Sequence, residues 1–109
     1  MYTSWGGNMK ELDTNLLITI SYFGVNTQQR KLQEEIFELQ EAIYDLENST
    51  LDTYEEALKN FKKELADVTN VLRQFQLEYG ISDDELLIER INKSNRTIKR
   101  VKEGYYKKG

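Results

Sequence analysis

The chain has 109 residues, 15 of them basic and 19 acidic, and it contains no cysteine, histidine or proline. The lack of cysteine excludes a disulfide framework and thiolate metal sites, and the lack of histidine excludes an imidazole base and a Ser-His-Asp triad. Any chemistry must therefore come from carboxylates, amines, guanidiniums, amides or hydroxyls. The absence of proline, together with 31% charged residues, favours helices.

Length and charge distribution also limit the partners. A chain of this size buries only about two-thirds of its unfolded surface, so we expect self-association, as a dimer or tetramer. The longest apolar stretch, around residues 16–23, is too short to span a bilayer, and no signal-peptide pattern opens the chain. We therefore expect a cytoplasmic protein without membrane contact. Residues 90–109 are strongly basic but the rest of the chain is acidic, which disfavours nucleic acid as a partner.

The first predicted helix covers residues 10–23. Residues 1–9 are expected to form a loose leader. Leu12, Leu16, Ile20 and Phe23 then recur at helical spacing, although residues 18–23 also have strand-like propensity. Gly24 is expected to end this helix, because glycine is the usual residue just after a helix C-terminus.

Two longer helices are predicted at 26–47 and 53–79. The apolar residues of each are spaced by alternating steps of three and four, which indicates one apolar stripe per helix. These residues are Leu32, Ile36, Leu39, Ile43 and Leu46 in the first, and Tyr54, Leu58, Phe61, Leu65, Val68, Leu72, Phe75 and Tyr79 in the second. Thr53 and Glu56 are expected to form a capping box at the start of the second stripe.

The last predicted helix covers residues 83–103 and opens with a capping box of Ser82 and Glu85. Four helices with short connections predict an all-α fold, an antiparallel four-helix bundle. We expect residues 10–104 to form a single domain, followed by a basic tail at 105–109.

Two pairs of acidic residues stand out. Glu35 and Glu38 lie one turn apart on the second predicted helix, and Glu64 and Asp67 lie one turn apart on the third. Each of the four residues precedes an apolar stripe position, so we expect all four to flank the seam between the helices. A single such pair is common by chance and usually marks a solvated face.

The register of the two helices brings these pairs together. In an antiparallel hairpin, residues at one level are equidistant from the turn, and the common midpoint of the two pairs is Leu51, within the predicted connection. Four converging carboxylates repel each other strongly unless a cation lies between them. Oxygen ligands without nitrogen or sulfur favour Mg²⁺, or Mn²⁺.

The sequence around these pairs resembles the signature of the MazG-like all-α nucleoside triphosphate pyrophosphohydrolases. The resemblance covers residues 12–100. It rests on Glu34-Glu35-Ile36-Phe37-Glu38, on Glu64-Leu65-Ala66-Asp67, and on the basic run Lys93-Ser94-Asn95-Arg96. Asn70 departs from the family pattern, because many relatives carry an apolar residue there.

The resemblance implies Mg²⁺-dependent hydrolysis of a nucleoside triphosphate to the monophosphate and pyrophosphate. The metal ligands it implies are Glu35, Glu38, Glu64 and Asp67. The catalytic residues it implies are Glu34, Glu35 and Glu38, with Glu34 orienting water from outside the ligand shell. The reaction needs no histidine, because a carboxylate suffices as proton acceptor once a metal has acidified the water.

Several substrate contacts stay open on the sequence alone. Lys93 and Arg96 share a helix face and either contact phosphate or complement the helix dipole. Asn70 either contacts the nucleotide or caps a polar gap. Tyr22 or Phe23 either stacks on a base or belongs to the core.

A rival interpretation is a non-catalytic helical oligomerisation module. In it, the apolar stripes drive association and the acidic residues keep the protein soluble. The matched level of the two carboxylate pairs separates the two interpretations, because a pure oligomerisation helix does not require it.

Overall fold

The computed structural model describes the backbone of residues 2–104 and the side chains of residues 9–104. Within this part of the chain there are four helices and no strand: α1 (Tyr2–Phe23), α2 (Val25–Glu47), α3 (Tyr54–Glu78) and α4 (Asp83–Lys102). The all-α prediction is thereby confirmed for the described residues. None of these helices is both long and apolar enough to cross a membrane.

The bounds of α2, α3 and α4 lie within one residue of the predicted ones. The predicted start of the first helix at residue 10 is wrong, because α1 begins at Tyr2 and includes most of the stretch expected to be a loose leader. The basic tail at 105–109 lies outside the described residues.

The chain divides into two compact units, with the boundary between Tyr79 and Gly80. The first unit contains α1, α2 and α3, and the second contains α4. The single domain and the antiparallel bundle of all four helices therefore stay predictions.

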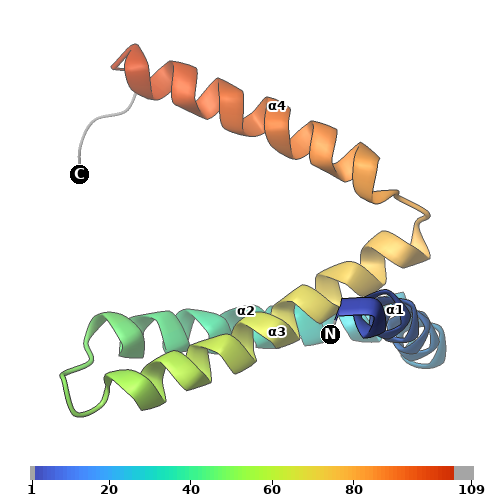
Figure 1. Cartoon of the computed structure of the whole chain (residues 1–109), viewed down its shortest axis with the longest axis horizontal. Helices are drawn as coiled ribbons and strands as arrows, with labels where there is room; N and C mark the ends of the chain where they lie inside the picture. The colour runs from blue at the N-terminus through green and yellow to red at the C-terminus, as the bar shows by residue number, and fades with distance from the viewer. Residues whose placement is uncertain (1, 105–109) are drawn as a thin grey trace. The chain divides into compact units, whose positions relative to one another are not determined.

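In the first unit, α2 and α3 lie side by side as a hairpin, and α1 lies across them near the start of α2 (Figure 1). α1 packs mainly on α3 and less on α2. The buried apolar side chains come from all three helices, and they are Leu16, Ile20, Ala42, Val68 and Val71.

Gly24 makes the sharp turn between α1 and α2. Its φ is 88°, a left-handed conformation in which a side chain is strained, and its N–H donates to the Ile20 carbonyl at 2.8 Å. The prediction that Gly24 ends the first helix is confirmed. This single-residue connection places the end of α1 beside the first turns of α2.

An ion pair also joins α1 to α3. The Arg73 guanidinium donates to both carboxylate oxygens of Asp13, at 2.9 and 2.7 Å, and both side chains are partly buried. A bidentate pair of this kind fixes orientation as well as distance.

The packed faces of α2 and α3 differ from the predicted stripes. Leu65 and Leu72, expected to be central in α3, are 43% and 52% exposed, whereas Val71 and Gln74 are buried. Each packed face is turned by about one residue from the apolar stripe, because α1 docks on one side of the hairpin and draws that side inward. Several apolar residues of the stripes consequently remain exposed within the first unit.

One of the two predicted capping boxes is correct. The Ser82 hydroxyl accepts from the Glu85 N–H at 3.1 Å, and the Glu85 carboxylate accepts from the Ser82 N–H at 2.8 Å, at the start of α4. The predicted box of Thr53 and Glu56 is wrong. The Thr53 hydroxyl accepts from the Thr50 N–H, and so it serves the loop before α3 and does not cap the helix.

Candidate metal centre

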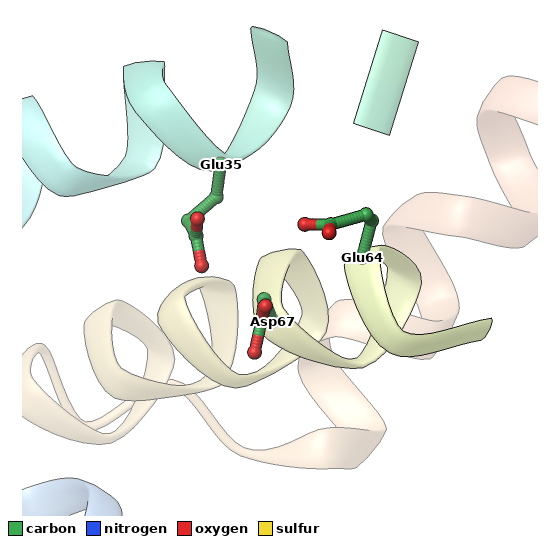
Figure 2. A group of neighbouring side chains, drawn as sticks. All are labelled: Glu35, Glu64 and Asp67. Carbon is green, nitrogen blue, oxygen red and sulfur yellow. The ribbon is translucent and has the colours of Figure 1, made fainter. Parts of the chain in front are cut away.

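The structure brings three of the four predicted metal ligands together. One carboxylate oxygen each from Glu35, Glu64 and Asp67 lies within 4.8 Å of the others. Figure 2 shows Glu35 extending from α2 toward α3, with Glu64 turned toward it and Asp67 one turn along α3. The register prediction centred on Leu51 is confirmed for the level of Glu35 and Asp67.

Glu35 lies in the seam between α2 and α3, although the sequence placed it beside the seam. It is only 6% exposed and occupies the same face of α2 as the buried Ala42, seven residues on. Burying a carboxylate in an apolar seam is costly unless a proton or a cation compensates its charge.

The electrostatics of the cluster reflect this cost. Burial raises the pKa of Glu35 to about 7, aided by a hydrogen bond with Glu38 and the charges of Asp67 and Glu38, and opposed by Lys31. Burial and the charges of Glu38 and Asp67 also raise the pKa of Glu64. Both shifts have burial as their first cause, and repulsion from the neighbouring acidic groups adds to it.

Glu64 has an oxygen without a protein partner. Among the described residues, its Oε1 is the buried side-chain polar atom that forms no hydrogen bond. A buried acceptor without a donor costs free energy, and a bound cation is one way to satisfy it. The set of donors, carboxylate oxygens only, is the type that Mg²⁺ and Mn²⁺ prefer.

Glu38 and Glu34 lie at the edge of this cluster. Glu38 is exposed but interacts with both Glu35 and Glu64, since it contributes to the raised pKa of each. It is absent from the tight group of three oxygens, so its side chain would have to move to bind the same ion. Glu34 is exposed and belongs to the wall of the neighbouring pocket.

A pocket of about 560 Å³ opens beside the cluster, between α1, α2 and α3. This volume is within the usual range for small-molecule sites. Glu34, Glu35 and Asp67 form its acidic end. A smaller hollow of about 330 Å³ on the hairpin is lined by Glu38 and Glu64.

Two cationic residues at the pocket were not singled out by the sequence reasoning. Arg30 and Lys31 both line it, and each precedes one of the acidic residues Glu34 and Glu35 by one turn on α2. Their spacing from Glu34 and Glu35 could have indicated them, because residues four apart lie on the same face of a helix. The positive charge of Lys31 partly offsets the rise in the pKa of Glu35, so the two groups interact electrostatically.

The pocket wall also contains amide and aromatic side chains. Asn70 is half-buried and lines the pocket one turn from Asp67. Phe23 lines it as well and is 53% exposed, and its neighbour Tyr22 is 80% exposed. Neither aromatic residue belongs to the core of the first unit.

The predicted phosphate contacts lie in the second unit. Lys93 and Arg96 are exposed residues of α4. The first turn of this helix is acidic and its last turn is basic. Both residues belong to the second unit, and a contact of either side chain with the phosphates of a ligand stays a prediction.

The chain matches no protein-family model, no curated protein and no solved structure.

Proposed function

We propose that the carboxylate cluster binds a divalent cation, Mg²⁺ or Mn²⁺, and that the protein is a nucleoside triphosphate pyrophosphohydrolase of the MazG-like type. Two observations carry the proposal: the convergence of Glu35, Glu64 and Asp67, and a buried oxygen of Glu64, Oε1, that has no hydrogen-bond partner among the described residues. Glu38 is proposed as the fourth ligand. A bound cation would supply neutralisation of phosphate charge and acidification of water.

The residues around the cluster fit a phosphorylated substrate. Arg30 and Lys31 stand at the same pocket as the acidic residues, and a nucleoside triphosphate needs protein cations in addition to a metal. In the proposed reaction, a water oxygen forms a bond to the α-phosphorus and the bond from that phosphorus to the bridging oxygen breaks, which releases pyrophosphate. Glu34, exposed at the pocket, is proposed to orient the water, and a carboxylate of Glu34 or Glu38 to accept its proton.

The direct test is pyrophosphate release from a mixture of nucleoside and deoxynucleoside triphosphates, with and without Mg²⁺. Activity that needs the metal is expected. Glu38→Gln should abolish it, while Glu47→Gln, an exposed acid on the same helix with the same change in charge, should leave it intact. Full turnover by Glu38→Gln would refute the assignment of this residue.

The second candidate function is the oligomerisation module, which the exposed apolar residues of the hairpin favour. Ile36, Ile43, Leu65 and Leu72 are each at least 39% exposed in the first unit. We propose that the protein is a homo-oligomer in either case, and a well-behaved monomer in sedimentation at micromolar concentration would contradict this. Pyrophosphate release distinguishes the two functions, since a pure association module has none.

A further inference from the structure

The pocket contains a pair of buried amides that the metal chemistry does not use. Gln28 of α2 and Gln74 of α3 are 5% and 4% exposed, and both line the pocket. The Gln28 Nε2 group donates to Gln74 Oε1 at 2.8 Å. Buried glutamine side chains are uncommon, and two in contact at a pocket wall call for a reason beyond packing.

This hydrogen bond leaves one acceptor atom and one donor atom of the pair without a role in it. Gln28 Oε1 is the remaining acceptor and Gln74 Nε2 the remaining donor. Neither atom is a fully buried group without a partner among the described residues, and both residues line the pocket. The pair therefore brings one further acceptor atom and one further donor atom to the pocket wall, and its own hydrogen bond orients the two side chains.

The amide pair stands at a defined distance from the metal site. Gln28 precedes Glu35 by seven residues on α2, and Gln74 follows Asp67 by seven residues on α3. Two helical turns correspond to about 10 Å. An extended nucleotide spans a comparable distance between its α-phosphorus and the hydrogen-bonding edge of its base.

An aromatic side chain in the pocket wall adds a surface for the face of a base. Phe23, at the end of α1, lines the pocket and is more than half exposed, so its ring is accessible. Stacking on an aromatic ring accepts any base, whereas hydrogen bonds to the base edge distinguish one base from another.

We propose that the Gln28–Gln74 amide pair binds the edge of the substrate's nucleobase, through the acceptor Gln28 Oε1 and the donor Gln74 Nε2, and so determines base preference. This inference rests on the proposed function. Every nucleobase has an edge with a neighbouring donor and acceptor, but their order and spacing differ between bases. A pair fixed by its own hydrogen bond favours the edges that match, because the others leave a buried amide group without a partner.

The decisive variant is Gln74→Glu. A glutamate at this position still accepts the hydrogen bond from Gln28 Nε2, but it offers no donor to the base. We expect the ranking of kcat/KM among the four deoxynucleoside triphosphates to change, with the preferred base losing roughly tenfold or more against the others. Gln40→Glu, an exposed glutamine on α2 with the same change, should preserve the wild-type ranking.

A second variant separates recognition from folding. Gln28→Leu with Gln74→Leu replaces both partners by apolar side chains, which leaves no buried amide unpaired and should spare the fold. We expect this double variant to keep its Mg²⁺-induced rise in melting temperature and to lose base preference. An unchanged ranking in both variants would overturn the inference, and so would a change confined to the ratio of ribonucleotide to deoxyribonucleotide.

Binding of deoxynucleoside monophosphates, measured by calorimetry, distinguishes failure of this inference from failure of the proposed reaction. If the wild-type protein hydrolyses no triphosphate but binds monophosphates with a base preference that Gln74→Glu alters, the reaction is wrong and base recognition stands. If hydrolysis occurs and neither ranking nor binding responds to the two variants, the amide pair is structural and base recognition is wrong.

Discussion

Replacing Glu35 by glutamine is expected to stabilise the metal-free protein and to remove its response to metal. Glu35 is nearly fully buried in the seam, beside three other acidic groups, and burial raises its pKa to about 7. Glutamine has nearly the same shape, carries no charge, and can donate a hydrogen bond to the carboxylate of Glu38. The substitution therefore removes the buried charge and keeps the packing.

The magnitude and the pH dependence follow from the pKa. The folded state holds the proton of Glu35 more tightly than the unfolded state, whose value is 4.5, so stability falls as pH rises from 4.5 to about 7 and is then level. At 1.36 kcal/mol per pKa unit, the upper limit of the penalty above pH 7 is about 3.4 kcal/mol. Because the cluster borders an open pocket, solvent screening reduces this to about 1–2 kcal/mol.

Thermal unfolding at two pH values tests the expectation. At pH 8 without metal, Glu35→Gln should melt about 5–10 °C above the wild type, and at pH 5 most of this difference should vanish. Mg²⁺ or Mn²⁺ at a hundred times its dissociation constant should add about 2.7 kcal/mol to the free energy of unfolding of the wild type and so raise its melting temperature. The melting temperature of the variant should not rise. Glu47→Gln serves as the control for net charge.

The opposite result would refute the reasoning. If Glu35→Gln melts below the wild type at pH 8 without metal, the Glu35 carboxylate makes favourable hydrogen bonds in the folded state. Repulsion within the acidic cluster then does not destabilise the metal-free protein. If the variant keeps the full response to metal, Glu35 is not a ligand.

The remaining predictions concern phosphate binding, the attachment of α1 and the cap of α4. Arg96→Ala should lower kcat/KM by roughly ten- to a hundredfold, the scale of one lost charge-assisted hydrogen bond. Lys107→Ala makes the same change in charge and should leave kcat/KM unchanged, and equal losses in both variants would indicate general electrostatic steering. Asp13→Asn should lower the free energy of unfolding by about 1 kcal/mol in urea titrations, more at low salt than at high salt, and Glu11→Gln on the same helix should have little effect. Ser82→Ala should cost about 1 kcal/mol and speed hydrogen exchange in the first turn of α4, and Ser82→Asp should restore the protection; unchanged exchange in Ser82→Ala would contradict the role of the cap.

Helix positions and hairpin register could be predicted from the sequence, because both depend on local chemistry. Steps of three and four residues identify a helix whatever it packs against, and glycine at positive φ ends one at Gly24. The level at which Glu35 meets Asp67 follows from counting residues to the turn around Leu51. The local prediction was wrong at Thr53, whose hydroxyl bonds to the preceding loop, and at the start of α1, which begins at Tyr2.

The tertiary structure decided which face of each helix is buried. An apolar stripe is wide enough to pack in more than one rotation, and the docking of α1 on α3 selects the rotation that buries Val71 and leaves Leu72 exposed. The same rotation carries Glu35 from the edge of the stripe into the seam and buries Gln28. The sequence alone determined that two carboxylate pairs meet, but the raised pKa of Glu35, the pocket beside it and the amide pair depend on neighbours that only the packing of three helices supplies.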